Sequence, residues 1–402
     1  MTEILLTIFF ISVLLFFLGS GIWVALSMIG VSAIGMMLFT SRPVGDAMAT
    51  TIWGTSSSWT LTALPLFVWM GEILFRTKLS ENLFKGLSPW MQKLPGGLIH
   101  VNVVGCALFA AISGSSAATV ATVGKMSIPE LRKRNYPEKI LLGSLAGSGT
   151  LGLLIPPSII LIIYGVAVQE SIAKLFIAGI IPGIMIALIF MSYVIIWSLI
   201  NKKSMPKIIE EYSFFEKIKR SKQLLPVIIL ILAVIGSIYT GIATATEAAS
   251  LGVVGALILS YFQKSLTLKT FKSSLLGATK TSCMIAFILA GSTFLSLAMG
   301  FTGLPRNLAL WIQNMELSPY VLIFVLMIFY IILGMFLDGI SAVVLTMAII
   351  EPMIRQAGFD MIWFGIFLVI VVEMAQITPP VGFNLFVLQG MAKKDMGYIA
   401  RS

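Results

Sequence analysis

The sequence predicts an all-α polytopic membrane protein with inverted-topology repeats, each containing a re-entrant helical hairpin and a helix broken at a Pro-Pro pair. Three observations predict this class. Of the 402 residues, 58% are hydrophobic and only 11% are charged, whereas a soluble domain carries roughly a quarter charged residues. Proline pairs interrupt two apolar segments, at Pro156-Pro157 and Pro379-Pro380. A stretch of small residues precedes each segment, and at about 20 residues per span the length allows roughly ten to twelve crossings.

The two proline pairs interrupt segments 147–165 and 374–384. Proline donates no backbone N–H and its ring clashes with the preceding turn, so a regular helix cannot continue. In hydrocarbon the freed carbonyl groups are tolerated only inside protein or beside a wet cavity. Carbonyl oxygens at that depth suit a hard cation, and paired broken helices in two halves of a membrane chain indicate a binding site.

The N-terminal part, 1–97, is interpreted as scaffold helices followed by an interfacial arm helix. Residues 4–40 are almost uninterruptedly apolar, with Gly19-Ser20-Gly21 in the middle, so we expect two short spans that meet at the glycines. A polar stretch precedes a span of about 60–75. Residues 76–97 alternate lysine and arginine with leucine, tryptophan and methionine, a pattern typical of an amphipathic helix at the membrane interface.

The first repeat is interpreted as 98–200. Small residues fill 106–124, and basic residues flank this stretch on both sides, so the positive-inside rule places both of its ends in the cytoplasm. We therefore expect a re-entrant hairpin with its tip at Gly114-Ser115-Ser116. The first broken helix and a return span of about 176–200 complete the repeat.

Residues 201–222 are expected to form a cytoplasmic loop between the two halves, because lysine and arginine dominate their charges. The second scaffold segment, 223–318, would contain spans of about 224–240 and 244–262 and a further span to about 300. The charged residues also account for the net charge of +10. They lie in short loops, so we interpret them as topology determinants and not as a nucleic-acid surface.

The second repeat is interpreted as 319–402. A hairpin over 320–352, with its tip at Asp338–Ser341, precedes the second broken helix. The first hairpin opens inward and the second outward, as an inverted-topology repeat requires. Two spacings support the repeat: Ser116 and Ser341 lie 225 positions apart, and the two proline pairs 223.

Several short motifs resemble those of the large membrane subunit of tripartite ATP-independent periplasmic (TRAP) transporters. The resemblance extends from about residue 15 to the end of the sequence. The motifs are Ala63-Leu-Pro-Leu-Phe67, Met70-Gly-Glu72, Ser113-Gly-Ser-Ser-Ala-Ala-Thr119, Leu151-Gly-Leu-Leu-Ile-Pro-Pro-Ser158, Leu175-Phe-Ile-Ala-Gly179, Thr246-Glu-Ala-Ala249 and Thr378-Pro-Pro-Val-Gly-Phe-Asn384.

The resemblance implies an elevator-type transporter, not an enzyme. It would import an organic anion, a carboxylate such as a C4-dicarboxylate or sialic acid, across the bacterial inner membrane with Na⁺ as the coupling ion. The implied partners are a small four-helix membrane subunit and a periplasmic substrate-binding protein. Members of the family usually end with a further hydrophobic helix, so we expect a truncated last helix here.

The resemblance also implies two sodium sites, one in each repeat. The residues of the first site are Ser113, Gly114, Ser115, Ser116, Gly149, Gly152, Ile155 and Pro157. The residues of the second are Gly334, Asp338, Gly339, Ser341, Ala375, Thr378 and Val381. An anion site between the tips would use Ser116, Ser158, Gln376, Thr378 and Asn384. No lysine or arginine in the middle of a span presents itself as a counter-ion, so sodium would supply much of the positive charge.

Small residues at the tips have a simpler explanation, because they let helices approach closely in membranes. Helix packing alone does not need broken backbone, however, and the Pro-Pro breaks therefore favour binding sites. Three glutamates lie in apolar surroundings, where ionisable groups usually have a function. For Glu72 we expect an ion pair with Arg76, and for Glu247 a helix cap. For Glu373 the neighbouring sequence suggests neither an ion pair nor a helix cap.

Two other functions are compatible with parts of the pattern. A stand-alone two-repeat anion and sodium carrier would have the same repeats but would need no binding protein. An intramembrane serine hydrolase would need Ser115 or Ser116 within hydrogen-bond reach of His100. We expect His100 near the cytoplasmic side and the serines near the middle of the membrane, which disfavours this alternative.

Overall fold

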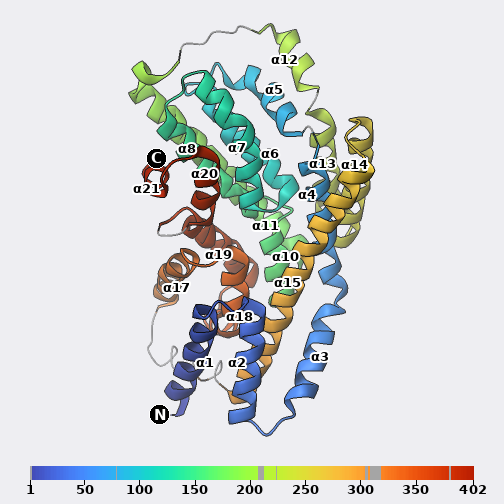
Figure 1. The fold of residues 1–402 in the computed structure, drawn as a ribbon, viewed down its shortest axis with the longest axis vertical. Helices are drawn as coiled ribbons and strands as arrows, with labels where there is room; N and C mark the ends of the chain where they lie inside the picture. Colours follow the sequence, from blue (N-terminus) through green and yellow to red (C-terminus); the bar gives the residue numbers. More distant parts are fainter. Residues whose placement is uncertain are drawn as a thin grey trace.

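The fold is helical in all the parts of the chain that the structure describes, and these parts contain no strand (Figure 1). The computed structural model describes residues 2–77, 79–206, 212–222, 224–303, 307, 318–379 and 382–402. The helices of the first half are α1 (Thr2–Gly19), α2 (Val24–Phe39), α3 (Val44–Ser56), η1 (Trp59–Thr62), α4 (Ala63–Phe75), α5 (Leu79–Met91), α6 (Ile99–Ser113), α7 (Ser116–Lys133), α8 (Glu138–Gly149), α9 (Leu151–Leu154), α10 (Ile159–Ala167), α11 (Ile172–Ile200), η2 (Lys202–Ser204) and α12 (Phe214–Ser221). Those of the second half are α13 (Leu225–Tyr239), α14 (Ala245–Phe262), α15 (Leu268–Thr302), α17 (Pro319–Gly334), α18 (Gly339–Gln356), α19 (Met361–Gln376), α20 (Phe383–Ala392) and α21 (Met396–Ala400).

Several of these helices have the length and composition of membrane spans. Within the described ranges, four single helices qualify (α11, α14, α15 and α18), and the number rises to seven if each bent pair counts as one span. Six shorter apolar helices of 10–17 residues add to them. The expected ten to twelve crossings therefore include segments that the structure divides into short helices. Large apolar side chains on α11, α13 and α17 are exposed on the protein surface, as in a multi-pass membrane protein.

The N-terminal segment forms two short helices, as predicted. Helices α1 and α2 meet at Gly19–Gly21, where Gly21 has a φ of +77° that glycine adopts without strain. The polar stretch that follows forms α3, which meets the η1–α4 helix at 54°. Threonine hydroxyls of α3 donate to the backbone one turn earlier, for example Thr51 Oγ1 to the Ala47 carbonyl at 2.7 Å.

The predicted arm helix is present as α5, and it contacts a helix that the sequence did not predict. Residues 214–221 of the expected loop form α12, which packs against α5. Trp90 Nε1 donates to Ser221 Oγ at 2.7 Å, and the Lys217 ammonium lies 5.4 Å from the centre of the Trp90 ring. Within the polar segment between the two halves, α12 therefore contacts the arm helix through Trp90.

Helix α15 is the long element against which α2, α3 and α4 pack, and α14 packs against α4 (Figure 1). The expected ion pair between Glu72 and Arg76 is present on α4. Arg76 Nε also donates to Ser273 Oγ of α15 at 3.0 Å. The expected cap is present as well, because Glu247 and Thr244 form a reciprocal capping box at the start of α14.

Both predicted hairpins are present, α6–α7 in the first half and α17–α18 in the second. They approach each other from opposite ends of the molecule (Figure 1). Ser115 is the N-cap of α7 and Asp338 is the N-cap of α18, and these residues lie 223 positions apart, as do the proline pairs. The 225-residue spacing of Ser116 and Ser341 is not the structural register. Ser116 begins α7, whereas Ser341 is the third residue of α18.

Each hairpin is tied to the broken helix of the other repeat. Helix α20 packs against α7, and α10 packs against α18. Arg132 at the end of α7 donates to the Ala392 carbonyl of α20 at 2.9 Å, and Arg355 at the end of α18 donates to the Val168 carbonyl after α10 at 3.0 Å. The two arginines lie 223 positions apart, which is also the spacing of the proline pairs, so the two contacts are equivalent in the two repeats. They also make ion pairs, Arg132 with Glu138 and Arg355 with Glu170 and Glu351.

Candidate cation and anion binding site

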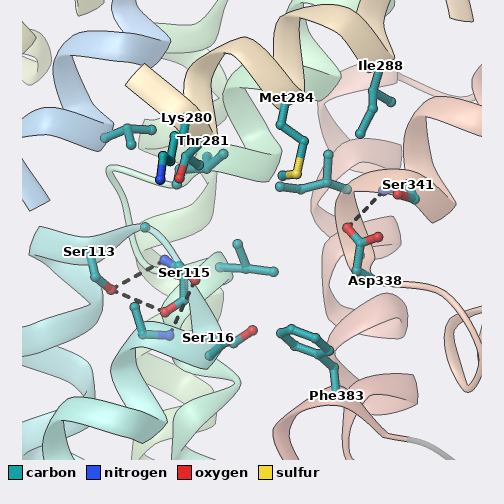
Figure 2. Close-up of a pocket in the computed structure, with 18 of the residues that line it drawn as sticks. Ser113, Ser115, Ser116, Lys280, Thr281, Met284, Ile288, Asp338, Ser341 and Phe383 are labelled. Carbon is teal, nitrogen blue, oxygen red and sulfur yellow. Dashed lines mark hydrogen bonds between the residues drawn. The ribbon is translucent and has the colours of Figure 1, made fainter. Parts of the chain in front are cut away.

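A cavity of about 1210 Å³ lies where the two hairpin tips meet α4 and α15 (Figure 2). Ser113–Ser116 line it from the first tip, and Asp338–Ser341 from the second. Gln376 at the end of α19 and Phe383 at the start of α20, the two halves of the second broken helix, also line it. The structure therefore brings the two tips, more than 200 residues apart in sequence, to one space.

The first tip is built by local hydrogen bonds. Helix α6 ends at Gly114, whose φ of +59° lies in the left-handed region. The next residue, Ser115, is the N-cap of α7, and its hydroxyl accepts from Ala118 N at 3.4 Å. Ser113 Oγ donates to the Ser115 carbonyl at 3.2 Å. The N-terminus of α7, with its partial positive charge, consequently begins at the cavity wall.

The first tip lies backbone to backbone against the first helix break. A Cβ atom at Gly152 would lie 2.6 Å from the Ser115 carbonyl oxygen, and one at Gly114 would lie 2.8 Å from the Pro157 carbonyl oxygen. Ile159 N donates to the Gly114 carbonyl at 3.3 Å. Glycine is required on both sides because no side chain fits between the chains. The approach brings carbonyl oxygens of both segments close together.

The remaining residues expected at the first sodium site lie on the same broken helix. Gly149 ends α8, and a Cβ atom there would contact Val120 of α7. Ile155 follows α9 with extended backbone, at φ −76° and ψ 123°. Its carbonyl group therefore departs from the helical direction at the break.

The second tip lies against the end of α19, where its glycines contact side-chain atoms. Asp338 caps α18 by accepting from Ser341 N at 3.2 Å. A Cβ atom at Gly339 would lie 2.9 Å from Gln376 Nε2, and one at Gly334 would lie 2.7 Å from Ala375 Cβ. The residues expected at the second site are therefore neighbours on the two elements.

Beyond α19 the chain turns at Gly382, whose φ is +49°. The carbonyl oxygens of Gln376 and Thr378 each lie 3.1 Å from the position that a Gly382 Cβ atom would take. Thr378 Oγ1 donates to the Met374 carbonyl at 2.7 Å. Val381, expected at the second sodium site, lies outside the described residues.

Three buried polar side chains near the second break lack hydrogen-bond partners. The atoms concerned are both carboxylate oxygens of Glu373, the side-chain oxygen of Gln376 and both amide atoms of Asn384. Glu373 faces the Ser116 hydroxyl across the seam between α19 and α7, without hydrogen-bond geometry. Leaving a buried polar group unpaired costs about 1–3 kcal/mol, and more for a charge. These atoms need partners that the described residues do not supply, and a bound ion or water can supply them.

The five residues expected to bind the anion occupy two kinds of position. Ser116 and Gln376 line the cavity. The other three are not among its lining residues. Ser158 is fully buried as the N-cap of α10, where it accepts from Leu161 N at 3.3 Å and donates to the Leu153 carbonyl. Asn384 is also fully buried, and Thr378 lies partly exposed at the break.

One charged residue that lines the cavity, Lys280, was given a different role in the sequence analysis. Lys280, interpreted as a topology determinant, lines the cavity from α15 beside Thr281 (Figure 2). No lysine or arginine was named from the sequence as a counter-ion, and the structure adds Lys280 as a cationic residue at the cavity that both tips line. Lys280 is the thirteenth of the 35 residues of α15 and directly precedes the uncharged run 281–302, so the sequence alone does not distinguish it from the lysines at the start of the helix.

The hydrolase geometry is not present in the hairpin. His100 Nε2 donates to the Pro95 carbonyl at 2.8 Å, and His100 lies at the opposite end of α6 from the serines. Thirteen residues of helix separate His100 from Ser113, which is about 20 Å at 1.5 Å per residue. A base at this distance cannot activate Ser115 or Ser116.

Comparisons with known proteins agree with this architecture. Residues 9–401 match the family model described as "Tripartite ATP-independent periplasmic transporter, DctM component". The C4-dicarboxylate TRAP transporter large permease protein DctM of Pseudomonas aeruginosa is 32% identical over 372 residues, which cover 92% of this chain and 86% of that protein. The isethionate TRAP transporter permease protein DctMQ of Oleidesulfovibrio alaskensis is 30% identical, over 96% of this chain and 60% of that protein.

A solved structure shares the fold. The YdaH transporter of Alcanivorax borkumensis, described as having an unusual topology, matches with a TM-score of 0.66 at 12% identity, over 96% of this chain and 93% of that chain. At this identity the match concerns the fold alone. The family model and the sequence relatives, by contrast, cover nearly the whole chain. The chain therefore belongs to the DctM family, the large permease components of tripartite ATP-independent periplasmic transporters.

Proposed function

We propose that this chain imports an organic anion across the bacterial inner membrane by sodium-coupled secondary transport. The relatives named for C4-dicarboxylates and isethionate support an anionic substrate. A carboxylate such as a C4-dicarboxylate or sialic acid is the substrate class that we propose. The observation that carries the proposal is the close contact of each glycine-rich tip with a broken helix, backbone to backbone in the first repeat, beside buried polar atoms that lack partners.

Sodium would be held where a tip meets a break. In the first repeat the donors would be hydroxyl and carbonyl oxygens of Ser113–Ser116 together with carbonyls of Gly149, Gly152, Ile155 and Pro157. In the second they would be oxygens of Gly334, Asp338, Gly339 and Ser341 with those of Ala375, Thr378 and Val381. A hard cation prefers such oxygen ligands, and the sodium charge would favour binding of an anion nearby.

The anion would bind in the cavity between the tips. Ser116 and Gln376 present a hydroxyl and an amide to this space. The N-termini of α7 and α18 begin at its wall and contribute partial positive charge. Ser158, Thr378 and Asn384 would support the site from the breaks behind it.

Transport would follow an elevator mechanism. The arginine contacts across the repeats tie both hairpins and both broken helices to one another. This body, 98–200 with 319–402, would move against a scaffold formed by 1–97 and 223–318. A scaffold of this kind keeps its large apolar surface towards lipid or a partner subunit.

The proposed partners are a small four-helix membrane subunit and a periplasmic binding protein that delivers the anion. The isethionate relative supports the membrane partner, because its name DctMQ denotes more than the M component and its length exceeds the matched region. A stand-alone carrier is the rival, and it differs by needing no binding protein.

Uptake into liposomes tests the proposal. The chain and its small subunit would be reconstituted together, and radiolabelled succinate, sialic acid and isethionate would be offered with and without the purified binding protein. We expect accumulation of one of these anions only with the binding protein and an inward Na⁺ gradient, and reduced rates after Ser116→Ala or Thr378→Ala. Accumulation that is equal under a K⁺ gradient, or that needs no binding protein, would overturn the proposal or favour the stand-alone carrier, respectively.

A further inference from the structure

Lys280 is the cationic residue among those that line the cavity in the described part of the chain. It projects from α15, and across the cavity lie Ser113, Ser115 and Ser116 of the first hairpin tip (Figure 2). Its side chain is exposed to the cavity and makes no ion pair with any described residue. A lysine ammonium that faces a wide cavity without a partner is available to a ligand.

The position of Lys280 differs from that of the other lysines on the helix. Lys269 and Lys272 lie in the first two turns of α15, where positive charge sets topology, and neither lines the cavity. Lys280 lies twelve residues after Leu268, which is about 18 Å along the helix. At this position the lysine lines the cavity, which the two earlier lysines do not reach.

The acidic residues of the cavity wall are engaged elsewhere. Glu72 is paired with Arg76 on α4. Asp338 accepts a hydrogen bond from Ser341 N as the cap of α18. Neither carboxylate is paired with Lys280, so within the described residues its ammonium is available to an anion that enters the cavity.

We infer that Lys280 binds a carboxylate group of the transported anion. This inference rests on the proposed function, and it names a counter-ion that the sequence analysis did not identify. The ammonium lies on the scaffold helix α15, whereas Ser116 and the start of α7 lie on the hairpin. An anion bound between them contacts both bodies, and movement of the hairpins relative to α15 removes the lysine from the anion. Lys280 thus stabilises the anion in one arrangement of the two bodies only.

Thermal unfolding of the purified complex with its small subunit tests this assignment without a transport assay. The unfolding temperature of the wild type would be measured in NaCl against increasing concentrations of succinate, sialic acid and isethionate in separate titrations. The titration would be repeated for the Lys280→Gln, Lys280→Arg and Lys272→Gln variants. A ligand that binds only the folded state raises the unfolding temperature once its concentration exceeds the dissociation constant, and the rise then grows with the logarithm of the concentration. The Lys272→Gln variant is a matched control, with the same charge change on the same helix outside the cavity.

We expect Lys280→Gln to need about ten- to hundredfold more succinate for the same rise, the range for one charged hydrogen bond. Lys280→Arg should recover most of the affinity, and Lys272→Gln should match the wild type. Wild-type stabilisation that Lys280→Gln leaves unchanged overturns the assignment but not the proposed function. Absence of wild-type stabilisation by succinate, sialic acid and isethionate alike overturns the anion site itself.

Discussion

Replacing Gly152 with alanine tests the contact between the first hairpin tip and the first helix break. The new Cβ atom would lie 2.6 Å from both the Ser115 carbonyl oxygen and the Ser116 Cα atom, whereas non-bonded heavy atoms rest at about 3.5–4.0 Å. Both neighbours are backbone atoms, so no side-chain rotation relieves the contact. The tip must therefore move by about 1 Å.

The size of the effect follows from two opposing contributions. Overpacking at a well-packed contact destabilises a protein by about 1–3 kcal/mol. Alanine in place of glycine in a helix returns up to about 1 kcal/mol. We therefore expect Gly152→Ala to lower the free energy of unfolding by roughly 1–2 kcal/mol. Sodium affinity should fall as well, because the tip oxygens would move away from those of the break.

Thermal unfolding of the purified complex, measured over a range of NaCl concentrations, gives both quantities. Gly390→Ala in α20 is the control, because an added Cβ atom there meets nothing within 4 Å. That substitution should be neutral or stabilising by up to about 1 kcal/mol. The reasoning is refuted if Gly152→Ala unfolds at the same temperature as Gly390→Ala and responds to the same sodium concentrations.

Three other substitutions test single contacts. Arg355→Ala removes the donor to the Val168 carbonyl and should destabilise the complex by about 1 kcal/mol, since the arginine is partly exposed; an unfolding temperature equal to that of the wild type would contradict this. Tyr164→Phe removes a buried donor to the Met361 carbonyl, 2.6 Å away, and should lower the unfolding free energy by about 1–2 kcal/mol in the same assay, whereas a neutral effect would show that this bond is dispensable. Thr244→Ala removes the cap of α14 and should destabilise by about 0.5–2 kcal/mol. Faster hydrogen exchange confined to the first turn of α14 is the expected sign, and unchanged exchange there would argue against the cap.

Features that depend on neighbouring residues were predictable from the sequence. The hairpin tip at Gly114, the break at Pro156-Pro157 and the junction of α1 and α2 all follow from glycine and proline chemistry. The ion pair of Glu72 with Arg76 follows from their spacing on one helix. Each of these signals lies within a few residues of the feature that it predicts.

Features that depend on distant contacts were missed. Helix α3 packs along α15, and α12 contacts Trp90 of α5. The first segment was described from the sequence only as a polar stretch, and the second was predicted to be part of a cytoplasmic loop because lysine and arginine dominate 201–222. The orientation of Lys280 likewise depends on how α15 is rotated against the hairpins, which no local pattern specifies.

The candidate site was predictable in its pairing of tips and breaks but not in the role of each side chain. Ser158 illustrates the reason, since a serine hydroxyl near a helix start suits a cap as well as a ligand. Glu373 illustrates the converse. Its apolar surroundings predicted a function, and the structure adds that it faces Ser116 without a partner.

The central claim is that sodium binding at the helix breaks drives accumulation of the anion. The most direct test counts both solutes: radioactive sodium and the radiolabelled anion that the wild type accumulates are followed in the same liposomes, with the binding protein present. We predict that sodium enters with the anion in a fixed ratio, and that Ser116→Ala lowers this ratio or abolishes uptake. Accumulation of the anion with no accompanying entry of sodium would contradict the account.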